Sequence, residues 1–367
     1  MVKIKNKKRR IAILTGGGDC PGINAVIRAV TKKAILKRNM EVIGVLDGYE
    51  GLIHNRYRTL SFDDVSGILT LGGTILGTTN KANPFHYAIK KGDEIKFSDC
   101  SAVVLSNIEA LKIECLVCVG GDGTLWISNR LHQLGVPIVG VPKTIDNDVR
   151  GTDITFGFDT AVSIATEGID RIHTTAQSHH RIMMVEVMGR KAGWIALHAG
   201  IAGGGDVILI PEMPYQIDRI ADYISQRRKT GRLFSIIVVA EGVMPMGGEA
   251  VVQKIVPDSA EQLRLGGISL VLGAKLEKLM ELETRAVVLG HLQRGGTSTP
   301  FDRILATRLG SKAIDLIEEK KFGQMVSVKG NYLAAYPLEE VAKGPRLATA
   351  DHEMIKAARA IGVCFGS

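Results

Sequence analysis

The feature that most constrains the fold is a series of short apolar runs in which hydrophobic residues follow one another without alternating with polar ones. A strand with one face in water alternates apolar and polar side chains, whereas a parallel strand covered on both faces does not. The runs are rich in valine, isoleucine and leucine, and they are too short for typical helices. They predict strands over residues 11–14, 41–46, 115–119, 137–141, 182–188, 207–210, 234–240 and 286–289, with a further short strand over 332–336.

Helical patterns occupy many of the intervals between these predicted strands. Residues 217–224 repeat isoleucine and alanine at the spacing of one helix face, basic residues follow, and Gly231 provides a stop. Residues 125–134 end at Gly135 in the same way. Strand followed by helix, repeated along the chain, predicts βαβ units in a doubly wound α/β sheet. Ligands of such sheets lie at the carboxyl ends of the strands, where the motifs described below also fall.

Length and hydropathy restrict the class of protein further. The chain has 367 residues, which favours two domains or lobes over one small core. No window approaches the run of about 20 apolar residues that a membrane span needs. The basic stretch from Met1 to Arg10 leads directly into the first predicted strand, which is unlike a secretory signal. We therefore expect a cytoplasmic protein with no membrane partner.

The cysteines and the net charge each allow two interpretations. The five cysteines are scattered, but Cys115 and Cys118 form a C-x-x-C within an apolar run. We favour a buried strand there over a redox pair, because no second metal-type pair accompanies it. The net charge of +8 fits either nucleic-acid binding or a set of arginines gathered for phosphorylated metabolites. Aromatic residues make up only 5% and are not interleaved with basic ones, so we expect no nucleic-acid partner.

The first candidate site is the glycine-rich segment of residues 15–24, which follows a predicted strand and precedes an apolar helix. Glycines such as Gly17 let backbone amides approach an anion, and the start of a helix adds partial positive charge. The segment matches neither G-x-G-x-x-G nor a Walker A motif. Taken alone, it fits a tight turn without a ligand as well as it fits a phosphate site.

The second candidate site is the run Gly120, Gly121, Asp122, Gly123 and Thr124, which again joins a predicted strand to a helix. A carboxylate inside a phosphate-accepting loop is a natural place for Mg²⁺, which prefers oxygen ligands and bridges phosphates. The simpler interpretation is that Asp122 only caps the helix. We favour the interpretation that combines phosphate and metal.

The third candidate site is the PKTIDND segment of residues 142–148, after another buried strand. Asp146 and Asp148 are two residues apart, so an extended segment projects both to one side. One carboxylate can accept a hydroxyl proton while the other holds a metal, as phosphoryl transfer requires. A capped acidic loop without chemistry is the alternative.

Four arginines lie near the ends of predicted strands, and their planar guanidinium groups suit phosphate. An isolated arginine is usually a surface group, and a lone histidine such as His291 is more often structural than a base. The clustering at element ends nevertheless indicates a phosphate clamp with a ligand contact from His291. The arginines are Arg181, Arg190, Arg285 and Arg294.

Taken together, these residues resemble the phosphofructokinase family from Ile11 to about Gly310. The resemblance rests on six segments in order, GGDGT, PKTIDND, VEVMGR, AEGV, HLQRGG and FDRILA. GGDGT alone would also fit NAD kinases or lipid kinases, but those lack the other segments. The resemblance implies two Rossmann-like doubly wound lobes with mainly parallel sheets and an active site in the cleft between them. It implies a donor lobe of residues 1–157 plus about 293–343, and a fructose 6-phosphate lobe of 158–292 plus about 344–367.

The resemblance also implies a role for each matching residue. Asp146 would be the base for the 1-hydroxyl of fructose 6-phosphate, in a catalytic set with Lys143, Thr144 and Arg190. Mg²⁺ would be the cofactor, held by Asp122 and Asp148. Gly17, Asn80, Lys81, Gly120, Gly121, Asp122, Gly123 and Thr124 would bind the phosphoryl donor. Thr144, Asp146, Met188, Gly189, Arg190, Glu241, His291 and Arg294 would bind the sugar phosphate.

Two of the arginines resemble a pair that family members lend to a neighbouring subunit. Arg181 and Arg285 would complete the sugar site of the neighbour. The resemblance therefore implies a homo-oligomer, and a homotetramer in particular.

The phosphoryl donor is the point at which the resemblance divides. Pyrophosphate users commonly have a lysine at the position of Lys143, but they also have an aspartate at the position of Gly123. The missing side chain at Gly123 leaves room for a nucleotide, so we favour ATP and keep pyrophosphate as the alternative. Many members have an arginine where this chain has Asn80, and Lys81 could substitute only as a point charge. A non-catalytic sensor is disfavoured, because all three aspartates are retained.

Overall fold

The computed structural model describes residues 8–92, 94–257 and 262–367, so the basic stretch noted at Met1–Lys7 lies outside the described residues. The larger of two main sheets has seven strands in the order β15-β14-β7-β6-β1-β2-β3. The inner pairs are parallel, and β3 and β15 join the two edges antiparallel. The strands are β1 (Arg10–Thr15), β2 (Glu41–Val45), β3 (Tyr57–Leu60), β6 (Cys115–Gly120), β7 (Ile138–Pro142), β14 (Gln324–Lys329) and β15 (Tyr332–Pro337).

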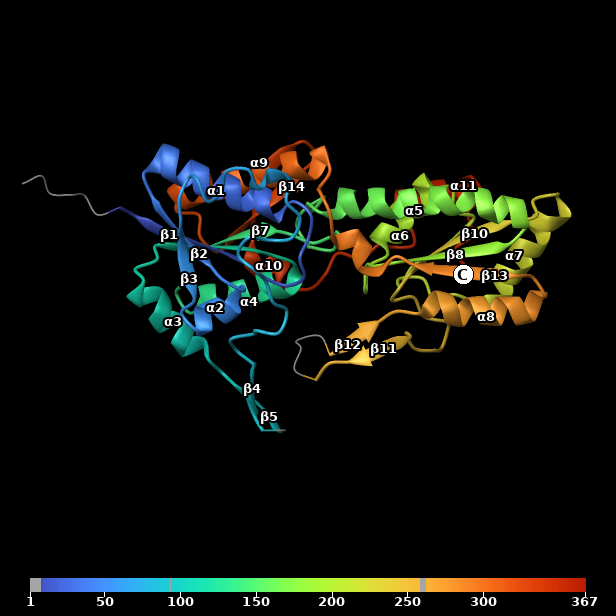
Figure 1. The fold of residues 1–367 in the computed structure, drawn as a ribbon, viewed down its shortest axis with the longest axis horizontal. Coiled ribbons are helices and arrows are strands. Elements are labelled where there is room, and N and C mark those ends of the chain that lie inside the picture. The colour runs from blue at the N-terminus through green and yellow to red at the C-terminus, as the bar shows by residue number, and fades with distance from the viewer. Residues whose placement is uncertain (1–7, 93, 258–261) are drawn as a thin grey trace, which may run out of the picture.

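The smaller main sheet has four strands, all parallel, in the order β13-β8-β10-β9. The two sheets lie side by side and define two lobes (Figure 1). Segments far apart in the sequence build the larger sheet, because its strands β14 and β15 follow β13 of the smaller sheet along the chain. The strands are β8 (Ile182–Val187), β9 (Val207–Leu209), β10 (Ser235–Ala240) and β13 (Thr284–Val288).

Helices cover both faces of each sheet, as the unbroken apolar strands require. In the large sheet, Ile11 and Ile13 of β1 pack on one side with α1 and α9, whereas Ala12 and Leu14 pack on the other side with α2, α3, α4 and α10. The helices of this lobe are α1 (Ile23–Arg38), α2 (Tyr49–Ile53), η1 (Ile68–Thr70), α3 (Ser101–Ala110), α4 (Asp122–Gln133), α9 (Pro300–Glu318) and α10 (Leu338–Val341).

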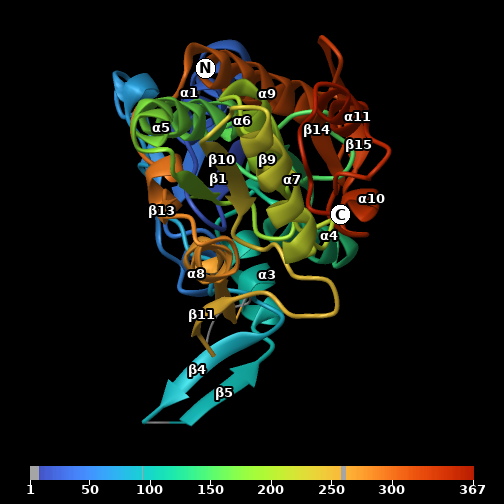
Figure 2. The same cartoon turned by 90° about the vertical axis from the view of Figure 1, so that its right-hand side faces the viewer.

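In the second lobe, α5, α6 and α11 lie on one face of the small sheet, and α7 and α8 lie on the other. Figure 2 looks onto the end of this lobe, with α5 above the strands and α8 below them. The helices are α5 (Phe158–His179), α6 (Trp194–Ala202), α7 (Ile217–Lys229), α8 (Ile268–Met280), η2 (Gly290–Arg294) and α11 (Glu353–Ala360).

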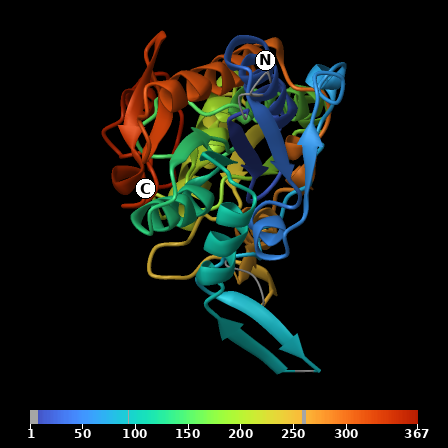
Figure 3. The same cartoon turned by 90° about the vertical axis from the view of Figure 1, so that its left-hand side faces the viewer.

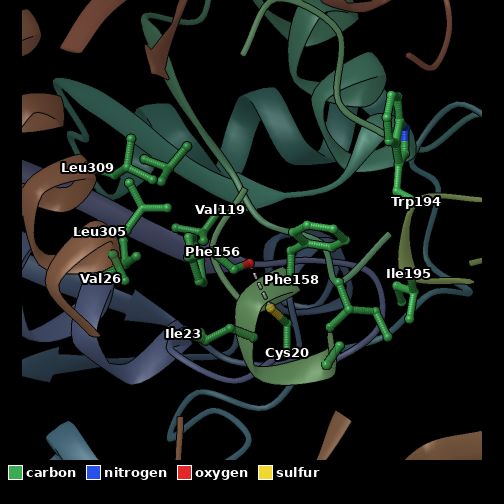
Figure 4. Close-up of a cluster of buried hydrophobic side chains, with 14 of the residues drawn as sticks. Cys20, Ile23, Val26, Val119, Phe156, Phe158, Trp194, Ile195, Leu305 and Leu309 are labelled. Carbon is green, nitrogen blue, oxygen red and sulfur yellow. Dashed lines mark hydrogen bonds between the residues drawn. The ribbon is translucent and has the colours of Figure 1, made fainter. Parts of the chain in front are cut away.

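A continuous hydrophobic cluster connects the two lobes. Figure 4 shows part of it, where Ile23 of α1 and Leu305 of α9 gather with Phe156, Phe158 and other side chains. The same cluster continues into α6 through Trp194 and Ile195. The Cys20 thiol lies in it and donates to the main-chain oxygen of Phe156 at 3.1 Å. Close-packed apolar side chains therefore join the two lobes beneath the loops at the carboxyl ends of the strands.

Two hairpins lie outside the main sheets, and the apolar runs did not predict them. One, formed by β4 (Tyr87–Lys91) and β5 (Glu94–Ser98), projects from the first lobe (Figures 2 and 3). The other, formed by β11 (Val252–Ile255) and β12 (Leu263–Leu265), belongs to the second lobe and faces the first (Figure 1). In both hairpins most of the described side chains are exposed, so the sequence carries no apolar signal.

The predicted α/β fold with mainly parallel sheets is confirmed. Every strand predicted from an apolar run is present, and so is the short strand near residues 332–336. The largest shift is at β13, which covers 284–288 rather than 286–289, because its polar first residues Thr284 and Arg285 hid its start. Cys115 and Cys118 are buried free thiols within β6, so the strand interpretation of the C-x-x-C is confirmed. Among the described helices, none is long and apolar enough to cross a membrane.

Candidate active site

Loops that follow three neighbouring strands of the large sheet meet beside its switch point. The chain runs from β1 to β2 and β3 in one direction, and later adds β6, β7 and β14 in the other. The switch point therefore lies between β1 and β6, at the carboxyl ends where doubly wound sheets bind ligands. The three motifs predicted from the sequence are the loops after β1, β6 and β7.

The loop after β1 is held closely against its neighbours. The Gly16 amide donates to Val119 O at 2.9 Å, and the Gly17 amide donates to Thr79 O at 3.1 Å. A side chain on Gly16 would place its Cβ 2.7 Å from Thr124 Oγ1, and Gly17 has a φ of 78°. Both positions therefore need glycine, one for the close approach and one for the left-handed backbone.

The loop after β6 runs directly into α4, which begins at Asp122. A Cβ on Gly120 would lie 2.2 Å from Thr124 Cβ, so this glycine is required by packing. Gly123 is different, because a Cβ there would meet no atom within 4 Å. Asp122 accepts the Gly123 amide at 2.7 Å. The N-terminal turn of α4 therefore presents its positive dipole end beside an open space at Gly123.

The loop after β7 is fixed by a small hydrogen-bond network. The Asp146 amide donates to Thr144 Oγ1 at 3.0 Å. Thr155 donates twice, from its hydroxyl to Thr144 O at 2.7 Å and from its amide to Asn147 Oδ1 at 3.0 Å. Asn147 has a φ of 53°, in the left-handed region. An asparagine tolerates this conformation better than most residues, which explains its place between the two aspartates.

Two cations connect the loop after β1 to the rest of the site. Lys143 is 3% exposed, and its ammonium group donates to the main-chain oxygen of Gly18. Burial lowers the pKa of Lys143. Arg294 lies in η2 and donates to Asp19 O at 2.9 Å. Lys143 thus comes from the first lobe and Arg294 from the segment that returns from the second.

Asp146 is the most unusual carboxylate of the site. It is 6% exposed, and its Oδ1 atom is buried without a hydrogen-bond partner. Burial raises the pKa of the Asp146 carboxyl, while the charges of Arg294 and Arg190 act in the opposite direction. A buried acceptor without a hydrogen bond costs folding free energy, so a ligand that donates a hydrogen bond to this oxygen would remove that cost.

The opposite wall comes from the ends of β8 and β10 in the second lobe. The turn after β8 contains Gly189 and Arg190, with φ values of 137° and 53°. The Arg190 amide donates to Glu241 Oε1 at 3.3 Å. A Cβ on Gly242 would lie 1.7 Å from Arg190 O, so glycine permits this close contact. Burial, followed by the charge of Asp146, raises the pKa of Glu241 to about 7.

These walls enclose a cavity of about 1100 Å³ that collects most of the predicted site residues. Gly120 and Gly189 do not line the cavity, but they are the sequence neighbours of Gly121 and of Met188, which do. Asp148 does not line the cavity; burial, followed by the charges of Asp146 and Asp122, raises the pKa of the Asp148 carboxyl. The predicted residues that line the cavity are Gly17, Asn80, Lys81, Gly121, Asp122, Gly123, Thr124, Lys143, Thr144, Asp146, Met188, Arg190, Glu241, His291 and Arg294.

Arg181 and Arg285 are the two predicted residues that lie away from this cavity. Both pair with Glu283, Arg181 at 2.6 Å and Arg285 through its Nη2 atom. They lie at the amino-terminal ends of β8 and β13, whereas the cavity lies at the carboxyl ends of the strands. Within one chain, therefore, these arginines do not contribute to the cavity.

Sequence reasoning missed several residues that line the cavity. Trp126 follows Asp122 by four residues in α4, a spacing that could have placed it on the same face. Phe85 contacts its ring edge-on, with 6.5 Å between ring centroids. Gln253, Lys254 and other residues of the β11–β12 hairpin also line the cavity, but no pattern in that exposed hairpin marked them.

The carboxylates fit a Mg²⁺ ion that is shared with phosphates and water better than a metal ion that is held only by protein ligands. Among the described residues, no group of three His, Cys, Asp or Glu side chains lies close enough to hold a metal. Mg²⁺ usually takes one or two carboxylates and completes its shell with phosphates and water. Asp122 lines the cavity, and burial, followed by the charges of Asp146 and Asp122, raises the pKa of Asp148, so Asp122 and Asp148 could provide a donor set of that kind.

Comparison with known proteins agrees with this architecture. The family model described as phosphofructokinase matches residues 10–317. The chain is 52% identical over 359 residues to ATP-dependent 6-phosphofructokinase 2 of Clostridium perfringens, covering 97% of this chain and 98% of that one. It is 45% identical over 358 residues to a pyrophosphate–fructose 6-phosphate 1-phosphotransferase of Streptomyces coelicolor, covering 97% of this chain and 100% of that one.

Among solved structures, Pichia pastoris phosphofructokinase in the T-state aligns with a TM-score of 0.78 at 32% identity. The alignment covers 92% of this chain and 36% of that one, so this chain spans little more than a third of the yeast protein. The family match covers most of the chain and includes every loop that builds the cavity. The chain belongs to the phosphofructokinase family.

Proposed function

We propose that this protein transfers the γ-phosphoryl group of ATP to the 1-hydroxyl of fructose 6-phosphate. The observation that carries the proposal is Asp146, a buried carboxylate of the cavity wall whose Oδ1 atom has no hydrogen-bond partner and which lies between phosphate-type loops and cationic side chains. A hydroxyl that donates to this oxygen would satisfy it and would be aligned for attack. Such an arrangement suits phosphoryl transfer, where positioning and charge stabilisation do most of the work.

Asp146 would accept the proton of the 1-hydroxyl as that oxygen bonds to the γ-phosphorus and the bond to the ADP oxygen breaks. Its raised pKa makes it a better base than an exposed aspartate. Arg190 and Arg294, both on the cavity wall, would stabilise the negative charge spread over the transferring group. The amides at the start of α4 and of the loop after β1 would hold the donor phosphates.

The side chains would divide between donor and acceptor along the two walls. The donor would lie on the first lobe, where Trp126, three residues after Gly123 in α4, offers aromatic surface to the cavity. Thr144, Met188, Glu241 and His291 would contact the sugar phosphate. The lobe boundaries expected from the sequence, near residues 157, 293 and 343, are part of this proposal.

ATP is favoured over pyrophosphate by the open space at Gly123, which a nucleotide could use. The relative from Clostridium perfringens carries an ATP-dependent name. Pyrophosphate remains a second candidate for a specific reason, since Lys143 lies at the phosphate loops and a relative at 45% identity carries the pyrophosphate name.

Mg²⁺ would be held by Asp122 and Asp148 together with donor phosphates. When bound, it would neutralise charge on the transferring phosphoryl group. We also propose a homotetramer in which Arg181 and Arg285 contact the sugar phosphate in a neighbouring subunit. This role is available to them because neither arginine lines the cavity of its own subunit. A cytoplasmic location is supported by five free thiols among the described residues.

The test is a coupled assay of the purified full chain with fructose 6-phosphate and Mg²⁺, with ATP and pyrophosphate offered separately. Turnover with ATP alone is the expected result, and chelation of the metal with EDTA should abolish it. Turnover with pyrophosphate in both directions would establish the second candidate instead. Binding of fructose 6-phosphate without turnover on either donor would refute both, and would indicate a sensor that has kept only the fold.

A further inference from the structure

The segment between α10 and α11 passes directly beside the loop that contains Asp146 and Asp148. The Arg346 amide donates to Asp148 O at 2.6 Å. The Arg346 guanidinium donates from Nη2 to Asn147 O at 2.7 Å. Two consecutive carbonyl groups of the aspartate loop are therefore held by one residue that is almost 200 positions away in the sequence.

The conformation at Asn147 makes this contact significant. Its left-handed backbone turns the chain between the two aspartates, so a relaxation there would redirect both carboxylates. The Asn147 side chain is fixed by Thr155 on one side. Its carbonyl is fixed by Arg346 on the other, so the unfavourable backbone conformation is held from two directions.

Arg346 is itself held by the second lobe. Its guanidinium lies over the ring of Trp194, with Cζ 4.6 Å from the ring centroid, and the Trp194 Nε1 donates to Arg346 O at 3.0 Å. Two residues later, the Ala348 amide donates to Glu212 Oε1 at 2.9 Å. Trp194 begins α6 and Glu212 follows β9, so both anchors belong to the second lobe.

The guanidinium is partly buried, and its Nε has no hydrogen-bond partner. Burial lowers the pKa of Arg346, and the nearby carboxylates of Asp153 and Asp148 oppose this effect. A surface arginine would avoid such a cost, and a purely structural contact could be made by an apolar side chain. What an apolar side chain could not supply is a directed donor to the Asn147 carbonyl.

We propose that Arg346 is a positioning residue for phosphoryl transfer, which clamps the Asn147–Asp148 backbone against the second lobe and so keeps Asp146 aimed into the cavity. The inference rests on the proposed function and deepens it. It also assigns a role to the carboxyl-terminal part of the chain, which lies beyond residue 317, where the family match ends. Arg346 does not touch the reacting atoms, so it acts only through the loop.

The test compares Arg346→Met and Arg346→Lys with wild type in the full chain. Arg346→Met keeps length and apolar contact with Trp194 but loses the donor, and it should lower kcat by roughly tenfold to a hundredfold, the size expected for a small misplacement of a catalytic group. The KM for fructose 6-phosphate should change less than about threefold, because the sugar contacts are untouched. Arg346→Lys can donate to one carbonyl and should recover part of kcat.

Arg359→Met is the matched control, because Arg359 is an exposed arginine of α11 that stacks on Phe365 away from the cavity. It should leave kcat unchanged. A second measurement, hydrogen exchange by mass spectrometry over residues 144–150, should show faster exchange in Arg346→Met and no change in Arg359→Met. The thermal midpoint of each variant reports whether folding is intact.

The outcomes separate the two ideas. An active wild type with unchanged kcat and unchanged exchange in Arg346→Met would overturn the role of Arg346 alone. A fall in kcat matched by a large fall in thermal midpoint, with no recovery in Arg346→Lys, would reduce Arg346 to a structural residue. A wild-type chain without turnover on ATP or pyrophosphate would overturn the proposed function, while the exchange measurement would still show whether the clamp exists.

Discussion

At the scale of single residues, the site is defined by carboxylates whose surroundings differ. Asp146 and Glu241 both line the cavity, and burial raises the pKa of both. Asp146 has an unpartnered oxygen, whereas Glu241 already accepts the Arg190 amide. One carboxylate is therefore suited to take a proton, and the other to hold a substrate hydroxyl.

The base role of Asp146 predicts the effect of Asp146→Asn. The amide fits the same space and can still accept a hydrogen bond, but it cannot take a proton. We expect kcat to fall by roughly 10²- to 10⁴-fold, the usual size of a general-base contribution, with a smaller change in KM. Asp153→Asn is the control, since Asp153 lies on the surface with Lys329 and should tolerate the change. Near-normal kcat in Asp146→Asn would assign the proton to another group.

The raised pKa of Glu241 predicts a dependence on pH. Because the folded-state value is about 7, against an ordinary 4.5, the side chain gains a proton as the pH falls through 7. The neutral form accepts sugar hydroxyls less well, so the KM for fructose 6-phosphate should rise between pH 8 and pH 6. In Glu241→Gln, KM should be higher at pH 8 and the profile flatter.

The sugar phosphate also titrates, with a pKa of about 6, so only the difference between the two profiles reports on Glu241. Superimposable profiles would exclude Glu241 as the titrating group. Linkage acts on folding stability in the direction opposite to its effect on substrate binding. A raised folded-state pKa stabilises the protein at acid pH, and that contribution is lost as the pH rises through 7.

At the scale of elements, the sequence predicted what apolar patterning and glycine chemistry can encode. Continuous apolar runs predicted the parallel strands, and the glycine-rich motifs predicted ligand loops at the carboxyl ends of β1 and β6. The β11–β12 hairpin and Trp126 were missed because exposed hairpins have no strong period and a lone tryptophan has no motif. Arg346 was missed because its contacts join segments far apart in sequence. Such contacts come from tertiary packing, which local patterns do not record.

The first turn of α4 predicts how the donor is selected. Gly123→Ala adds a methyl group to open space, so activity with ATP should be nearly unchanged. Gly123→Asp adds a negative charge beside the proposed donor phosphates. Two like charges about 4 Å apart near a protein surface repel by ~4 kcal/mol before screening, so kcat/KM for ATP should fall at least about tenfold. Steady-state assays with ATP and pyrophosphate measure this, and equal losses in both variants would show that space, not charge, decides.

At the scale of the whole molecule, Arg181 and Arg285 are placed where they cannot reach the cavity of their own chain. Both lie at the end of the small sheet opposite to the cavity, and both pair with Glu283. An ion pair this exposed contributes little to stability, so folding alone gives weak reason for two arginines there. Their position instead fits a surface that meets another copy of the chain.

This position predicts complementation between two inactive variants. Arg285→Ala should raise the KM for fructose 6-phosphate sharply, and Asp146→Asn should lower kcat. If each site combines Asp146 of one subunit with Arg285 of its neighbour, subunits mixed by mild dissociation and reassociation should form some intact sites. The mixture should then exceed the sum of its two parents, measured at low fructose 6-phosphate.

The control for complementation is a mixture of Asp146→Asn with Lys143→Ala, because both residues belong to the same cavity of one chain. In a hybrid of these two variants, every cavity lacks either native Asp146 or native Lys143, so no activity should return. Size-exclusion chromatography with light scattering must first show an oligomer. A monomer with full activity would place Arg181 and Arg285 outside the reaction, and would leave the cavity of a single chain as the complete site.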